Sequence, residues 1–127
     1  MSYNYVIDTS IWIEYFAGSS KGIKIKEIIE KEVIATSIFA IAEISDKYER
    51  EGMQSEKVIS FIQSKAVIIP LTVELCVSAA KIKKKYRKIK EKFGIADAIH
   101  LSTAQDLKAT FLTADNDFKE IENVILV

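Results

Sequence analysis

Short apolar runs alternate with amphipathic segments along the chain. The runs are rich in β-branched and aromatic residues, which favour strands, and they lie at residues 3–7, 33–36, 66–69, 109–113 and 124–126. The segments between them carry apolar residues three or four positions apart, which predicts helices over residues 11–16, 20–32, 37–52, 55–64, 72–94 and 97–106. Strands separated by helices favour a mostly parallel sheet covered on both faces, so we expect an α/β fold.

The longest predicted helix covers residues 72–94. Its apolar positions follow a 4-3-4-3-4 spacing, which predicts one continuous buried stripe formed by Leu75, Ala79, Ile82, Tyr86, Ile89 and Phe93. We expect Gly94 to end this helix. The only cysteine, Cys76, lies in its apolar first part, and we expect a buried structural thiol there.

Composition indicates one globular domain over residues 1–127. The chain is 49% hydrophobic and 28% charged, which is typical of a folded domain rather than of disorder. Basic and acidic residues number 18 each, so the net charge favours no particular partner. A single cysteine excludes an internal disulfide framework and a multi-cysteine metal site. The sequence has no signal-peptide pattern and no apolar run of membrane-spanning length, so we expect a soluble cytoplasmic protein.

Three carboxylates lie in unusually apolar sequence surroundings. Glu43 is the only charged residue in residues 33–45, and both Asp8 and Asp97 are flanked by apolar residues without a basic neighbour. An ionised carboxylate that is buried without a partner is strongly destabilising. A divalent cation compensates several such acids when they converge, and an all-oxygen ligand set favours Mg²⁺ or Mn²⁺ over zinc.

A fourth carboxylate, Asp115, lies near the end of a predicted strand. Asp8 directly follows the first predicted strand, and Asp115 follows the fourth by two residues. In parallel α/β sheets, ligands bind beyond the carboxyl ends of the strands. If the first and fourth strands are neighbours, these two carboxylates lie at the same edge of the sheet.

Each of these acids also has a purely structural interpretation. Asp8 and Asp97 can cap the helices that begin beside them, and Asp115 can belong to an ordinary Asx turn. Glu43 has no helix end to cap, which leaves a buried ion pair with a distant lysine or arginine. Four separate explanations are then needed where a single metal site would account for all four residues.

Four motifs around these acids resemble those of the PIN-domain family, specifically the small VapC-type toxins of prokaryotic toxin–antitoxin pairs. The resembling segments are residues 6–10, 37–43, 94–104 and 112–118. They occur in the family's order over essentially the whole chain, and each of the four acidic positions is intact. No departure from the family pattern at these positions suggests an inactive enzyme.

The resemblance implies a PIN fold, which is a three-layer α/β/α sandwich, and a Mg²⁺- or Mn²⁺-dependent ribonuclease activity. The metal ligands and catalytic residues that it implies are Asp8, Glu43, Asp97 and Asp115. Neighbouring polar residues can hold these ligands in place through hydrogen bonds, and the candidates are Thr9, Ser10, Thr113, Asn116 and Asp117. The resemblance also implies a homodimer, an RNA substrate and a cognate antitoxin as partner.

The only histidine, His100, lies three residues after Asp97. A general-acid role is conceivable for it, but a nuclease that works without metal needs both an acid and a base. A single histidine cannot supply both groups. We therefore expect His100 to serve local packing or hydrogen bonding.

Residues 81–92 are strongly basic. They contain eight basic residues and one acid, whereas the rest of the chain has 10 basic and 17 acidic residues. The apolar stripe of the predicted helix continues through this segment, so the charges lie on its outer face. Candidate RNA-binding residues are Lys84, Lys85, Arg87 and Lys88, with an ordinary solvated surface as the alternative.

Two other classes of function compete with the ribonuclease. A non-catalytic PIN-like module that binds RNA or protein is the main alternative, although intact acids argue against it. A phosphatase of the haloacid dehalogenase type needs a second aspartate two residues after the first. Ser10 occupies that position, which disfavours such a phosphatase.

Overall fold

The computed structural model describes residues 2–127. Its elements in chain order are β1 (Tyr5–Ile7), α1 (Thr9–Ala17), α2 (Ser20–Lys31), β2 (Ile34–Ser37), α3 (Ile38–Arg50), α4 (Glu56–Lys65), β3 (Ala66–Ile69), α5 (Val73–Arg87), α6 (Ile95–Asp106), β4 (Thr110–Thr113), the 3₁₀ helix η1 (Asn116–Phe118) and β5 (Val124–Leu126). Each predicted strand and helix is present. Their ends lie within a few residues of the predicted ones, except for the end of α5. No helix within the described part of the chain is long and apolar enough to span a membrane.

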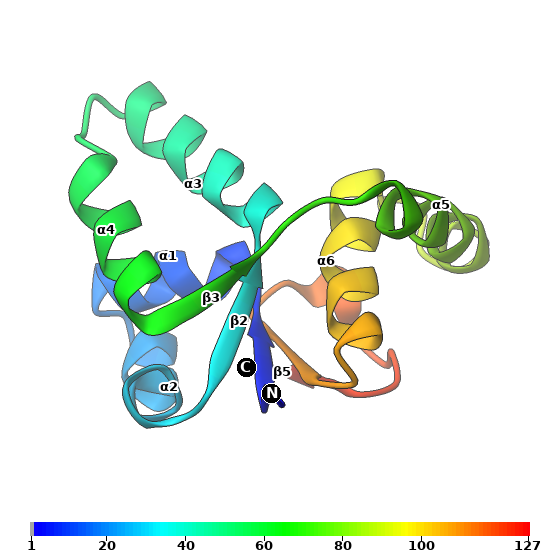
Figure 1. The fold of residues 1–127 in the computed structure, drawn as a ribbon, viewed down its shortest axis with the longest axis horizontal. Helices are drawn as coiled ribbons and strands as arrows, with labels where there is room; N and C mark the ends of the chain where they lie inside the picture. Colours follow the sequence, from blue (N-terminus) through cyan, green and yellow to red (C-terminus); the bar gives the residue numbers. More distant parts are fainter. Residues whose placement is uncertain (1) are drawn as a thin grey trace.

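The five strands form one parallel sheet in the order β3-β2-β1-β4-β5. The first and fourth strands are therefore neighbours, and Ile7 of β1 pairs with Leu112 of β4. Parallel neighbours require crossover connections, which the helices provide. Helices α1 to α4 cover one face of the sheet and α5 and α6 cover the other, so the fold is a three-layer α/β/α sandwich (Figure 1).

Successive strand residues point into two separate cores. Val6 and Phe111 pack beneath α5 and α6, whereas the next residues, Ile7 and Leu112, pack with the helices of the opposite face. This alternation follows from the two-residue period of a strand. Trp12 lies fully buried in the second core, where its indole N–H donates to the Thr36 hydroxyl at 3.2 Å. Both faces of the three inner strands, β2, β1 and β4, are thus largely buried, as expected for a parallel sheet.

Helix α5 ends earlier than the apolar stripe predicts. The helix stops at Arg87, and the chain continues through turns in which the N–H groups of Ile89 and Lys90 donate to Tyr86. Ile89 is 77% exposed, whereas Phe93 is fully buried from outside the helix. The like charges four residues apart in this segment repel each other and weaken a continued helix. A regular spacing thus predicted one helix where the structure has a helix and a turn.

The prediction that Cys76 is buried is wrong. Its side chain is exposed and free, and its neighbours Val73 and Val77 are also exposed. The buried positions of α5 are Leu75 and Ala79. Cys76 is the residue next to Leu75, so the helical turn of about 100° per residue carries it away from the core.

A close approach between α1 and α2 depends on Gly22. A Cβ atom at this position would lie 2.2 Å from the backbone oxygen of Glu14, which is an impossible contact without movement of the backbone. We predict that Gly22→Ala lowers the free energy of unfolding by about 1–3 kcal/mol, as measured by chemical denaturation. Ser20→Ala on the exposed start of α2 is the control and should change little. A gain in stability for Gly22→Ala, as helix propensity alone would give, would contradict this packing.

Candidate active site

The four predicted acids come from elements that meet at the carboxyl edge of the sheet. Asp8 follows β1 directly, and its N–H donates to the Leu112 oxygen of β4 at 3.0 Å. Asp115 follows β4 by two residues. Glu43 lies on α3, which begins where β2 ends, and Asp97 lies in the first turn of α6. The expected adjacency of the first and fourth strands is confirmed, and it brings Asp8 and Asp115 to the same edge.

Asp8 is almost fully buried, and two hydroxyl groups hold its side chain. The hydroxyls of Ser10 and Thr113 donate to Oδ2 at 2.6 and 2.8 Å. Asp8 is the N-cap residue of α1, but its side chain makes no capping hydrogen bond. The helix-capping interpretation of this carboxylate is therefore wrong. These two hydrogen bonds fix the rotamer of the Asp8 side chain.

Thr113 and Ser10 also tie the Asp8 carboxylate to the segment that carries Asp115. The N–H of Asp115 donates to the Thr113 hydroxyl oxygen at 3.0 Å, and the N–H of Ala114 donates to the Ser10 hydroxyl oxygen at 2.9 Å. Each hydroxyl thus links the Asp8 carboxylate, at the end of β1, to the backbone that follows β4. This supports the predicted role of Ser10 and Thr113 in holding the acids in place.

Asp97 and Asp115 each use one carboxylate oxygen inside their own turn. Asp97 Oδ2 accepts the Gly94 N–H at 2.9 Å, which closes the first turn of α6. Asp115 Oδ1 accepts the Asp117 N–H at 2.9 Å, so the Asx-turn interpretation also holds for that oxygen. In both residues, the second oxygen has no hydrogen bond to the described part of the chain. A structural role for one oxygen therefore leaves the other available for a ligand.

The pKa of the Asp97 carboxyl lies above its ordinary value. Burial raises this pKa, and the negative charges of Asp115, Asp117 and Asp8 raise it further. The hydrogen bond from Gly94 opposes these effects only in part. Asp97 thus lies within the electrostatic reach of three other acids, as expected for a cation site.

Glu43, which is half-buried, pairs with the buried His100, a contact that the sequence did not predict. His100 Nε2 and the Thr9 hydroxyl both contact Glu43 Oε1, each at 2.6 Å, which leaves Oε2 without a hydrogen bond to residues 2–127. The alternative prediction was an ion pair between Glu43 and a lysine or arginine. The partner is a histidine instead. His100 is buried, and its Nδ1 has no hydrogen-bond partner among the described residues.

Burial opposes the charge on both members of this pair. At Glu43, the hydrogen bonds from His100 and Thr9 and the charge of His100 together outweigh burial, so its pKa lies below the ordinary value. At His100, the hydrogen bond to Glu43 and the surrounding negative charges together outweigh burial, so its pKa lies above the ordinary value. The charges of Asp8 and Asp97 also help to raise the pKa of His100. His100 therefore offsets part of the negative charge of the site. The expected hydrogen-bonding role of this residue is confirmed, and its partner is a predicted site residue.

The carboxylate oxygens of the site are the ligand type that a hard divalent cation prefers, but their arrangement does not surround a single point. Within residues 2–127, no three histidine, cysteine, aspartate or glutamate side chains already form a group that could hold a metal ion. Glu43 is turned toward His100, and Asp97 and Asp115 each engage their own turns. Mg²⁺ retains several of its waters and needs only one or two direct carboxylates, so the free oxygens fit water-mediated binding.

The remaining predicted residues differ in what they contact. Thr9 holds Glu43, as described above. Asp117 contributes its backbone N–H to Asp115 and its negative charge to the surroundings of Asp97. Asn116 is exposed, and its side chain makes no hydrogen bond within residues 2–127. The structure thus gives Asn116 no contact that supports the site.

A model of the PIN domain matches residues 5–124. The chain belongs to the PIN domain family. Its fold, with acids at the carboxyl edge of a parallel sheet, is thus the PIN fold. A search of curated proteins finds no matching sequence.

Solved PIN structures share the fold at low sequence identity. A toxin–antitoxin complex from Klebsiella pneumoniae superposes with a TM-score of 0.76 at 22% identity, over 96% of each chain. VapC20 of Mycobacterium tuberculosis, described as a toxin that cleaves the sarcin–ricin loop, gives 0.74 at 16% identity, over 94% of this chain and 95% of that chain. VapBC-1 of nontypeable Haemophilus influenzae gives 0.73 at 19%, over 97% and 96%. These similarities concern the fold.

The Glu43–His100 pair makes a prediction about stability and pH in metal-free buffer. The lowered pKa of Glu43 stabilises the fold above pH 4.5, and this contribution is lost as the pH falls through the folded-state pKa. The raised pKa of His100 stabilises the fold below pH 6.5, and this contribution is lost as the pH rises through the folded-state pKa. Both contributions are therefore present together between these two values.

We predict that His100→Gln costs more unfolding free energy near pH 5.5 than near pH 9. Glutamine keeps an N–H donor but cannot carry the charge. Denaturant unfolding in EDTA at both pH values measures the difference. Ile99→Val, a buried change on the same helix, is the control and should cost about 0.5–1.5 kcal/mol at either pH. An equal loss for His100→Gln at both pH values would show that the pair carries no charge.

Proposed function

We propose that this PIN domain is a Mg²⁺- or Mn²⁺-dependent ribonuclease that hydrolyses RNA phosphodiester bonds. The observation that carries the proposal is the placement of Asp8 and Asp115 at one edge of the sheet, where the hydroxyls of Ser10 and Thr113 join the two strand ends. The charges of nearby acids help to raise the pKa of Asp97, and a divalent cation would offset that repulsion. The proposal takes residues 1–127 as one PIN domain.

Four residues would hold the cation: Asp8, Glu43, Asp97 and Asp115. When bound, Mg²⁺ or Mn²⁺ supplies an acidified water and neutralises charge on the phosphate oxygens. Ser10 and Thr113 fix the Asp8 carboxylate, so its free oxygen keeps one orientation. Thr9 and His100 hold Oε1 of Glu43 and leave Oε2 to accept a proton from water or to face the cation. Hydrogen bonds to such ligands commonly contribute 10–100-fold to metal affinity or activity.

Membership in a toxin–antitoxin pair is the second part of the proposal. The Klebsiella pneumoniae structure that shares this fold is a toxin–antitoxin complex, and VapC20 is named as a toxin that cleaves the sarcin–ricin loop. We propose that this chain acts in the cytoplasm as such a toxin, forms a homodimer and is blocked by a cognate antitoxin. Co-purification of the chain with the product of an adjacent reading frame tests the partnership.

The metal mechanism predicts a large loss of cleavage when either of two ligands is neutralised. Asp8→Asn and Glu43→Gln preserve size and remove charge, and each should lower kcat/KM on an RNA panel at least about 100-fold. EDTA should abolish wild-type cleavage, and Mg²⁺ or Mn²⁺ should restore it. Asp106→Asn and Glu49→Gln, exposed acids on α6 and α3, are matched controls that should retain activity.

Two results would contradict the proposal. Cleavage that persists in EDTA, or full activity in both variants, would exclude a mechanism through these carboxylates. Specific RNA or protein binding by wild type without turnover in either metal would indicate the alternative, a non-catalytic PIN-like binding module. Titration calorimetry with Mn²⁺ tests the metal site separately from cleavage. Asp8→Asn should weaken Mn²⁺ binding whether or not an active RNA substrate has been found.

A further inference from the structure

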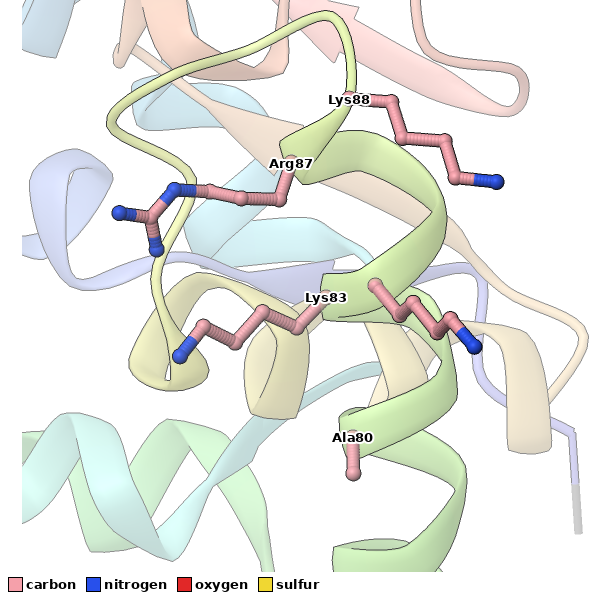
Figure 2. A pocket seen from close by; sticks show the side chains of 5 residues that line it. Ala80, Lys83, Arg87 and Lys88 are labelled. Atoms are coloured by element: carbon pink, nitrogen blue, oxygen red, sulfur yellow. The ribbon is translucent and has the colours of Figure 1, made fainter.

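A second candidate site lies on the outer face of α5, a helix that contributes none of the four carboxylates. It is an open groove of about 470 Å³, lined by Ala80, Lys83, Lys84, Arg87 and Lys88. Lys83 and Arg87 extend on one side of the helix and Lys88 extends on the other (Figure 2). The members are spaced so that Lys83 and Arg87, and likewise Lys84 and Lys88, lie one helical turn apart. We call this feature the α5 groove.

The four cations of the α5 groove have no acidic partner within residues 2–127. The ion pairs in this part of the chain involve Lys31, Lys47, Arg50 and His100, which all lie elsewhere. No acidic side chain lines the groove. Like charges one turn apart on a helix repel each other, so this arrangement is unfavourable unless a counterion is bound. A bound polyanion would remove that repulsion.

The remaining chemistry of the α5 groove favours backbone phosphates over bases. Its only uncharged lining residue is Ala80, so it offers neither an aromatic ring for base stacking nor an acceptor for a base edge. Lys85 and Tyr86 lie outside it and line a different cavity, where the Lys85 ammonium lies 5.1 Å from the Tyr86 ring centre. Lys83 thus replaces Lys85 in the set that the sequence suggested. Cations without base contacts provide affinity without sequence preference.

Arg87 connects the α5 groove to the carboxylate site. Its Nη1 donates to the backbone oxygen of Phe93 at 3.4 Å. The next residue, Gly94, donates its N–H to the Asp97 carboxylate. The groove therefore flanks the loop that leads into α6 and its acid. A phosphate chain that approaches the negatively charged acids needs a positive surface beside them, and this groove is in the appropriate position.

We infer that the α5 groove binds the phosphate backbone of the RNA substrate, independently of sequence, beside the segment cut at the carboxylates. This inference rests on the proposed ribonuclease function. It assigns affinity and salt dependence to Lys83, Lys84 and Lys88. Selection of the cleaved sequence must then come from contacts elsewhere.

The test removes two charges that have no role in the fold. Lys84→Gln with Lys88→Gln is compared with Lys24→Gln with Lys26→Gln, two exposed lysines of α2 that form no ion pair within the described residues. Binding of the full chain to a labelled single-stranded RNA is measured by anisotropy in EDTA, from about 50 to about 200 mM salt. The groove variant should lower the slope of log K against log salt by about 1.4, or about 0.7 per lost contact. The α2 variant should match wild type.

Further arms separate this inference from the proposed function. Two RNAs of unrelated sequence should show the same loss in the groove variant, and cleavage assays should show a raised KM with kcat unchanged. Wild type that binds RNA but never cleaves it would overturn the ribonuclease proposal, whereas the binding arm would still test the groove. A groove variant with the salt slope of the α2 variant, or a loss confined to one RNA sequence, would overturn the inference.

Discussion

The parallel pairing of β1 with β4 is the constraint on which the rest of the site depends. It places Ile7 opposite Leu112, so the next residues of both strands leave the sheet at the same edge. Asp8 and the segment to Asp115 are then close enough to share the hydroxyls of Ser10 and Thr113. A shift of one residue in this register would turn Ile7 and Leu112 out of their core, so burial of the strands specifies the position of the acids.

The cost of gathering acids is offset locally rather than by distant ion pairs. Hydroxyls stabilise Asp8, the Gly94 N–H stabilises Asp97, and His100 with Thr9 stabilises Glu43. These partners are neutral donors except for His100, so they support the carboxylates without cancelling all their charge. Asp97 still has a raised pKa in their presence. A fully compensated cluster would be more stable but would have no residual attraction for a cation, which is a common conflict between stability and function.

Much of the fold could be predicted from the sequence because its signals are local. The strands are compact β-branched runs, and serine is a common N-cap residue: Ser37 caps α3 by accepting the Phe39 N–H. The end of α5 was mispredicted because Phe93 is buried from a turn at a spacing that also suits a helix. Among the acids, local sequence identified candidates but not their partners. Glu43 and His100 are 57 positions apart, and only the packing of α3 against α6 brings them together.

The charge balance of the chain conceals a separation that matters for function. Equal numbers of acidic and basic residues give a net charge of zero, yet four acidic residues lie near the carboxyl edge of the sheet while lysines and an arginine gather on α5. The angular position of each basic residue around the helix decides whether it lines the groove, which places Lys83 in the groove and Lys85 outside it. If the α5 groove binds RNA and the carboxylates cut it, one RNA strand must be able to reach both regions at the same time. The short connection from Arg87 through Phe93 to Gly94 meets that requirement, because it holds the end of the basic helix against the loop that positions Asp97.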